Sequence, residues 1–185
     1  HGTPIGSTAN VVTVALEGKA FANTAGPTAL QPGAPFFSFV YDGKPSSELL
    51  PTWKVERSSK KLDEVRTEWT IVYTDPKTGL IVRCVAIEYR DFPTVEWTLY
   101  FKNPGKSDSP ILEKIQAVDL PLARGQHGEF LLHHAVGSPC QVNDFQPLES
   151  PLPPNSTKKI GAAGGRATCS DMAFFNLEAP AGSGV

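Results

Sequence analysis

The chain has 185 residues, 19 acidic and 17 basic side chains, and a formal net charge of −2. Nucleic-acid-binding proteins usually present a basic face, so this charge balance argues against a nucleic-acid partner. No run of about 18 apolar residues occurs, which argues against a membrane-spanning helix. The length suits one sizeable domain over residues 1–185, and 17 prolines and 16 glycines spread along the chain favour an all-β fold with many turns.

Alternation of apolar and polar side chains predicts short strands in the first third of the chain. The candidates cover residues 10–16, 36–41 and 53–57, and segments rich in proline and small residues connect them. The polar stretch 58–64 is typical of a solvent-exposed hairpin end. No stretch of a dozen residues shows helical periodicity, so we predict no helix of ordinary length.

The clearest pattern lies in the middle of the chain. Residues 67–73, 80–89 and 94–102 predict three adjacent antiparallel strands, and the proline and glycine of residues 75–79 suit the turn between the first two. In the third strand, Trp97 shares one face with Val95, Leu99 and Phe101. We therefore predict that Trp97 is buried between two sheets.

Strand patterns continue at residues 111–120 and 129–136, and the character of the sequence then changes. Residues 137–166 are rich in proline, glycine and small polar residues, with only a weak strand candidate at 157–160. This predicts a long loop region, and loops of that length are usually functional or packed against a partner. A last strand is predicted at 173–177, and the chain stops at Val185 without a turn or cap, as a fragment of a larger protein would.

The residues that most often carry chemistry form no convincing set. Cys84 lies among strand residues as a small buried hydrophobe, whereas Cys140 and Cys169 lie in loop-like stretches, so a bridge between them stays a lesser alternative. His133 and His134 are adjacent on a strand and point to opposite faces, which favours two structural histidines. No nucleophile elbow, phosphate-binding loop or zinc spacing is present. We predict no catalytic residue, no metal and no cofactor in this chain.

One group of loop residues is suited to binding sugar. Asn143, Asp144 and Phe145 on one loop and Arg166 after Gly164 and Gly165 on another supply amide, carboxylate, aromatic and guanidinium groups. These groups bind hydroxyls and the CH face of a sugar. The residue types alone favour the other interpretation, an ion pair between Asp144 and Arg166 that stiffens the loops.

Several motifs, in a fixed order over most of the chain, resemble a known family. They are DFPTVEW at 91–97, FKNPG at 101–105, ILE at 111–113, IQA at 115–117, DL at 119–120, GS at 137–138, NDFQPL at 143–148, GGR at 164–166 and AFFNLE at 173–178. Together they are similar to the N-terminal β-sandwich of α-galactosidase-type enzymes, glycoside hydrolase family 36 and its relatives. The resemblance implies an antiparallel supersandwich of the galactose-mutarotase-like type.

The resemblance also implies a function. In that family the sandwich precedes a (β/α)-barrel, which holds an aspartate nucleophile and an aspartate acid/base for retaining hydrolysis of terminal α-linked sugars. This chain would be the non-catalytic domain that packs on the barrel, its partners being the barrel of the same protein and carbohydrate. Asn143, Asp144, Phe145 and Arg166 would face the barrel's sugar pocket, and a secreted or periplasmic location would be favoured over others.

Two other functions remain open from the sequence. The first is a free-standing carbohydrate-binding module, for which an exposed aromatic platform would be needed. The second is a complete small enzyme of the mutarotase-like type, which requires a histidine and a carboxylate that converge in one cleft. The opposite directions expected for His133 and His134 argue against this second alternative.

Overall fold

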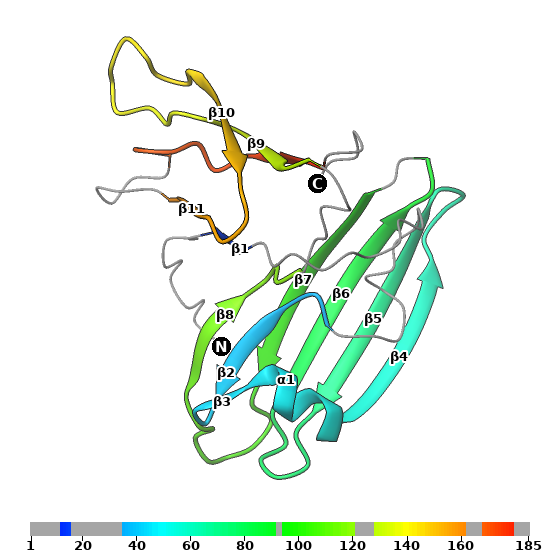
Figure 1. Ribbon diagram of the computed structural model, residues 1–185. Helices are drawn as coiled ribbons and strands as arrows, with labels where there is room; N and C mark the ends of the chain where they lie inside the picture. The colour runs from blue at the N-terminus through cyan, green and yellow to red at the C-terminus, as the bar shows by residue number, and fades with distance from the viewer. Residues whose placement is uncertain (1–11, 16–34, 92–93, 121–127, 162–167, 180–185) are drawn as a thin grey trace. The chain divides into compact units, whose positions relative to one another are not determined.

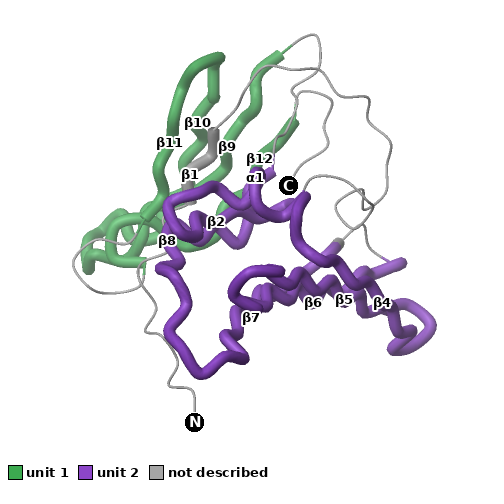
Figure 2. The backbone as a smooth tube through the Cα atoms, turned by 90° about the horizontal axis from the view of Figure 1, so that it is seen from below, with its two compact units in different colours: residues 1–23, 121–185 green, residues 24–120 purple. Residues whose placement is uncertain are grey.

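The computed structural model describes residues 12–15, 35–91, 94–120, 128–161 and 168–179. The chain divides into two compact units, residues 24–120 and residues 1–23 with 121–185, which are coloured separately in Figure 2. All strand pairs in both units are antiparallel, which confirms the all-β antiparallel class. No helix in the described ranges is long and apolar enough to cross a membrane.

The unit formed by residues 24–120 contains a four-stranded sheet in the order β4-β5-β6-β7 (Figure 1). Its strands are β4 (Lys54–Lys61), β5 (Arg66–Thr74), β6 (Ile81–Tyr89) and β7 (Thr94–Lys102). The three central strands lie where the alternation predicts them. β4 is longer than predicted, because Ser58 to Lys61 continue the pairing with β5 although their side chains are exposed. Backbone pairing outweighs the polar composition there.

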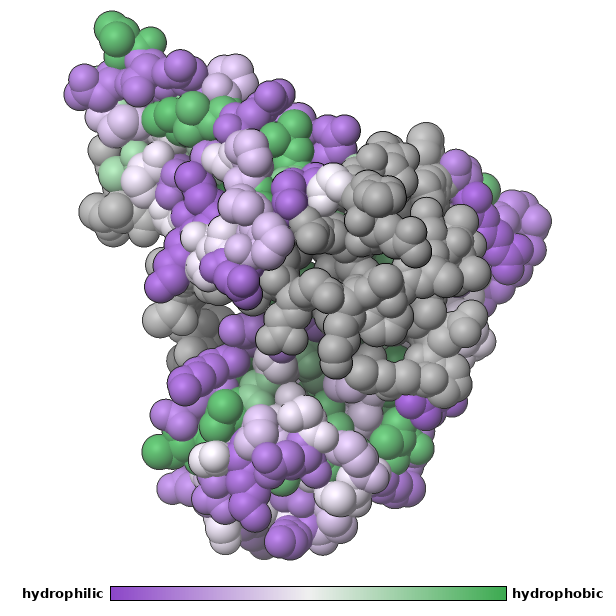
Figure 3. All heavy atoms as spheres, in the orientation of Figure 1, coloured by the Kyte–Doolittle hydropathy of each residue, from purple (hydrophilic) through white to green (hydrophobic). Residues whose placement is uncertain are grey.

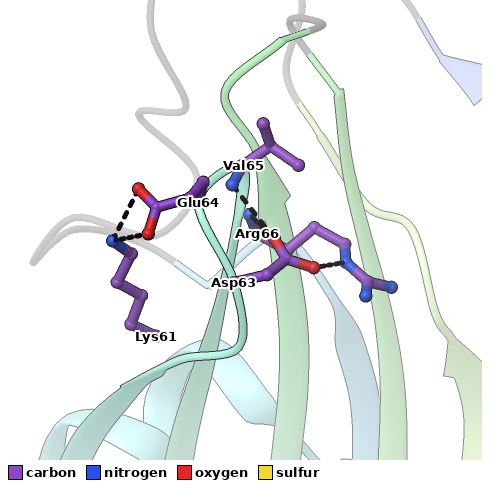
Figure 4. Close-up of polar contacts among 5 residues, drawn as sticks. All are labelled: Lys61, Asp63, Glu64, Val65 and Arg66. Atoms are coloured by element: carbon purple, nitrogen blue, oxygen red, sulfur yellow. Dashed lines mark hydrogen bonds and ion pairs between the residues drawn. The ribbon is translucent and has the colours of Figure 1, made fainter.

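The turn between β4 and β5 is held by two short-range ion pairs (Figure 4). One oxygen of Asp63 accepts the backbone N–H groups of Val65 and Arg66, and the other lies 2.7 Å from the Arg66 Nε atom. Lys61 Nζ lies 3.1 Å from Glu64. The Arg66 side chain, followed by the Val65 N–H, lowers the pKa of Asp63. The turn occupies residues 62–65, so the hairpin end is shorter than predicted.

A three-stranded sheet, in the order β3-β2-β8, lies over one face of the four-stranded sheet in the same unit (Figure 1). Its strands are β2 (Ser38–Tyr41), β3 (Lys44–Pro45) and β8 (Leu112–Gln116). Two helical turns, α1 (Ser46–Leu49) and η2 (Leu50–Thr52), follow β3. They are too short to produce a periodic pattern in the sequence. β8 carries a bulge with Lys114 at a φ of 49°, where three residues of β8 span the length of two in β2.

The core of this unit lies between the two sheets, which gives a sandwich-like fold with open edges. Its buried members are Phe36, Phe37, Phe39, Tyr41, Leu50, Trp53, Ile71, Tyr73, Leu80, Val82, Cys84 and Ala86. Trp97 packs against this cluster, as predicted from its face, but it is only partly buried, so the prediction that it is buried between two sheets is wrong in extent. The reason is that β7 is an edge strand, and its core-facing side chains lie at the rim of the sandwich.

The other unit contains a three-stranded sheet with β9 in the centre. Its strands are β10 (Pro147–Leu152), β9 (Phe130–Ala135) and β12 (Asn176–Glu178), and a separate pair is formed by β1 (Val12–Ala15) and β11 (Thr157–Ile160). The buried cluster consists of Phe130, Leu132, Leu152, Ile160 and Leu177. β11 confirms the weak strand candidate.

β10 contradicts the prediction that residues 137–166 form a long loop region. Leu148, Ser150 and Leu152 alternate toward the interior, with Leu152 buried, while Pro147 and Pro151 are exposed. The two prolines hide the strand pattern, but an edge strand tolerates proline because one side of its backbone has no neighbour to bond. The described loop between β9 and β10 is therefore much shorter, covering residues 136–146.

Candidate functional site

The β9–β10 loop, residues 136–146, extends β9 and packs its backbone against a second segment. The Gly137 N–H donates to the Ser170 carbonyl at 2.9 Å, and the Ser138 N–H donates to the Thr168 carbonyl at 2.6 Å. Gly137 is buried, and a Cβ atom built there would lie 2.1 Å from the Thr168 carbonyl oxygen. Only glycine permits this approach, and the loop is therefore anchored to residues 168–170 at its start.

Asp144 organises the rest of this loop. Its Oδ2 atom accepts a hydrogen bond from the Ser138 hydroxyl and its Oδ1 atom accepts one from the Gln141 N–H, both at 2.8 Å. The Asp144 N–H donates back to the Gln141 carbonyl at 3.1 Å. The Gln141 N–H, followed by the Ser138 hydroxyl, holds the pKa of Asp144 below its ordinary value. The carboxylate is thus ionised at neutral pH and fixes the conformation of its own loop.

The loop held by Asp144 presents polar and apolar side chains to solvent. Asn143 is exposed, and its backbone carbonyl accepts from the Gln146 N–H at 3.1 Å. Phe145 is 55% exposed at a φ of 61°, and Val142 is fully exposed. Hydrophobic residues are visible at the surface of the unit that contains β9 and β10 (green in Figure 3). An aromatic ring and an amide are therefore displayed on a loop whose backbone is already ordered.

The fourth predicted site residue, Arg166, lies outside the described residues together with Gly164 and Gly165. The predicted ion pair between Asp144 and Arg166 is consequently untested. What is observed is that Ser138 and Gln141 already contact both oxygens of Asp144. The loop is stiffened by its own residues.

A cluster that the sequence did not predict lies on the outward face of β9. His133 Nε2 is 2.7 Å from Glu178 Oε2 of β12, and His133 Nδ1 is 3.4 Å from Glu149 Oε1 of β10. The three side chains are 35%, 49% and 67% exposed for His133, Glu178 and Glu149. The cluster links β9, β10 and β12 at the surface.

His134 occupies the opposite face of β9 and is 6% exposed. Its Nε2 atom lies 2.9 Å from the Ser150 hydroxyl, and its Nδ1 atom is buried with no hydrogen-bond partner. Burial lowers the pKa of His134, Lys158 lowers it further, and Asp171 opposes both. The opposite orientations predicted for the two histidines are observed, and His134 is a neutral side chain of the interior.

Two carboxylates of the four-stranded sheet have structural roles, and the two loop cysteines form no bridge. Glu88 accepts a hydrogen bond from the Trp69 indole at 2.9 Å, and Glu96 accepts one from the Tyr89 hydroxyl at 3.1 Å. Cys140 and Cys169 are both free, so the bridge considered between them is absent. Among the described residues, no group of three or more histidine, cysteine or acidic side chains is arranged to hold a metal ion.

The His133 cluster was missed for an identifiable reason. It depends on β10, which was predicted as loop, and on the register that sets Glu149 beside His133. The alternation of Leu148, Ser150 and Leu152 could have predicted β10, but the neighbouring Pro147 and Pro151 are unusual in a strand. Glu178 lies 45 residues from His133 in the sequence, a separation at which no local pattern predicts a contact.

Searches against protein-family models, curated proteins and solved structures found no match.

Proposed function

We propose that this chain is the non-catalytic β-domain of a glycoside hydrolase acting on terminal α-linked sugars, and that its β9–β10 loop faces the sugar pocket of a (β/α)-barrel. The proposal starts from the resemblance of the sequence motifs to α-galactosidase-type enzymes. A domain in this role needs a rigid loop with exposed recognition groups and needs no acid/base pair of its own.

The observation that carries the proposal is the loop ordered by Asp144. Its carboxylate binds Ser138 and Gln141, and the neighbouring Asn143 and Phe145 are left exposed. A preformed loop loses little conformational entropy when it contacts a partner or a sugar. In this role Asp144 positions the loop, while Asn143 and Phe145 make the contacts.

The His133 cluster does not support an enzyme of the mutarotase-like type as well as it supports a structural role. The histidine and its two carboxylates converge, but Glu149 and Glu178 are largely exposed on the open face of a sheet. General acid–base catalysis works best in a site that excludes water. The cluster is better suited to joining β9 to β10 and β12.

Two measurements test the proposal. The purified chain should not hydrolyse an aryl α-galactoside above a heat-treated control, and hydrolysis well above that control would refute a non-catalytic role. In the protein that joins this chain to a barrel, Phe145→Ala should lower kcat/KM for the α-galactoside. Phe174→Ala is the matched control, because Phe174 is 77% exposed in the same unit but lies outside the loop. If the two changes lower kcat/KM equally, the β9–β10 loop does not contact the sugar.

The free-standing carbohydrate-binding module remains the second candidate because Phe145 and Phe174 are both exposed aromatic rings. Exposed aromatic faces bind the CH groups of sugars. Calorimetric titration of the isolated chain with α-galactosides separates the two functions. Binding by the chain alone that is lost in Phe145→Ala favours the module, whereas no binding favours a domain that needs its barrel.

A further inference from the structure

β7 is an edge strand with one unpaired side. It pairs with β6 through nine residue pairs, from Ile81 with Lys102 to Tyr89 with Thr94. On its other side no described strand is its neighbour, and its backbone makes no hydrogen bond there with any described residue. With respect to the described residues, this side of β7 is a row of unpaired N–H and C=O groups, and such a row is a template for another strand.

The two edges of the same sheet differ in charge. The opposite edge strand, β4, is KVERSSKK and carries five charged side chains, Lys54, Glu56, Arg57, Lys60 and Lys61. Charged side chains, lysine above all, protect edges from pairing with other strands. β7 is TVEWTLYFK, with Glu96 near its start and Lys102 at its end, and its interior from Trp97 to Phe101 is uncharged. The protected edge is β4, and β7 is left open.

The sequence of β7 is complementary to itself in one antiparallel register. Side chains alternate between the two faces of a strand. The apolar side chains of two paired copies therefore lie on the same face only if residues opposite each other are both odd-numbered or both even-numbered. Centring the pairing on Leu99 sets Glu96 opposite Lys102 twice and sets Trp97 opposite Phe101 twice. If the pairing is centred on Thr98 or on Tyr100 instead, Glu96 and Lys102 no longer lie opposite each other. Each then faces an uncharged residue or a position beyond the end of the strand.

We propose that β7 pairs antiparallel with β7 of a second copy of this chain, around a two-fold axis at Leu99. The pairing joins the two four-stranded sheets edge to edge. Glu96 of each copy lies opposite Lys102 of the other on the outer face, where Glu96 and Lys102 are both exposed. Directly opposite charges and aromatic pairs are the contacts that stabilise neighbouring strands. The occupant of this edge is therefore a second copy.

Charge reversal tests this register. Sedimentation equilibrium of the wild-type chain at high micromolar concentration should give twice the monomer mass. Glu96→Lys and Lys102→Glu should each weaken self-association by about tenfold or more, because each change creates two like-charge contacts across the axis. An equimolar mixture of the two variants restores both opposite-charge contacts and should associate as tightly as wild type. Circular dichroism checks that each variant is folded.

Lys60→Glu is the matched control, since it makes the same charge change as Lys102→Glu on the other edge of the sheet, where Lys60 is exposed. It should leave the association constant unchanged. A wild-type chain that stays monomeric would overturn the proposal. So would a dimer that Lys60→Glu weakens as much as Lys102→Glu does, or a mixture of the two β7 variants that fails to associate. The hydrolase assays above are independent of these results.

Discussion

The indole N–H of Trp97 donates a hydrogen bond of 2.7 Å to the backbone carbonyl of Ala117. Trp97 lies on β7 of the four-stranded sheet, and Ala117 immediately follows β8 of the three-stranded sheet. The Trp97 ring also meets Phe36 edge-on with ring centroids 4.6 Å apart. One side chain thus joins the two sheets along one open side of the sandwich.

Removing this link should destabilise residues 24–120 measurably. We expect Trp97→Ala to cost about 2–3 kcal/mol, less than a fully buried tryptophan, because the ring is partly exposed. Trp97→Phe keeps most of the apolar contact and loses the hydrogen bond, so it should cost about 1 kcal/mol. Urea unfolding measures both. Equal costs for the two variants would mean that the hydrogen bond, rather than packing, is the main contribution.

Gly137→Ala should disrupt the anchoring of the β9–β10 loop. A Cβ atom 2.1 Å from the Thr168 carbonyl oxygen forces the backbone to move, and we expect a loss of at least about 2 kcal/mol. Gly105→Ala is the control, because the nearest atom to its added Cβ would be a side-chain oxygen of Asn103 at 3.1 Å rather than a backbone atom at 2.1 Å. Thermal unfolding of both variants tests this. Similar midpoints would show that residues 168–170 yield without cost.

Asp144 should control the order of its loop in a pH-dependent way. Its pKa is lowered in the folded chain, so its contribution is present above the unfolded value of about 3.9 and is lost as pH falls through the folded value. Asp144→Ala should speed hydrogen exchange at the Gln141 amide, which loses its acceptor. Ser138→Ala removes only the hydroxyl contact and should change that exchange less. Unchanged exchange in Asp144→Ala would contradict the role assigned to this carboxylate.

His134 should make the unit that contains β9 less stable in acid. Its folded pKa is lowered, so the unfolded chain binds more protons, and stability should fall as pH drops below about 6.5 toward the folded value. His134→Gln should remove this part of the pH dependence. Its neighbour His133 supplies the control, because His133→Gln alters a surface contact and leaves the buried ring in place. Urea midpoints measured across this pH range test the prediction, and a slope that persists in His134→Gln would assign it to another group.

Cys84 and Cys140 should differ in reactivity toward a thiol reagent. Burial raises the pKa of the Cys84 thiol to about 11, and the side chain is fully buried. Cys140 is exposed and free. Because the thiolate is the nucleophile, Cys140 should react rapidly and Cys84 only after unfolding. Mass spectrometry of the native chain after brief labelling checks the order, and early labelling of Cys84 would contradict its burial.

The part of the fold that the sequence predicts is the part where neighbours in space are neighbours in the chain. β5, β6 and β7 follow one another through short turns, and alternation in β7 identifies its core face. Trp97 shows the limit of this inference. The pattern assigns a side chain to a face but does not reveal that the strand lies at an edge, where burial is partial.

The candidate site shows a second limit. Residue types predict that Asn143, Asp144 and Phe145 lie together on one loop. The hydrogen-bond partners of Asp144, however, depend on the backbone conformation of that loop, which includes positive φ angles at Cys140 and Phe145. The His133 cluster depends on register between strands distant in sequence. Neither kind of information is present in alternation or composition.

The charged strand β4 has a consequence for how large an assembly can become. A sheet with two open edges can add copies without limit and form a filament. In the four-stranded sheet, as far as the structure describes it, β7 is the one edge without the protective charges of β4, and a two-fold contact uses the same strand of both copies. Once two β7 strands have met, each remaining edge of the joined sheet is a lysine-rich β4. Growth through the four-stranded sheet therefore ends at two chains, and the composition of β4 sets that limit.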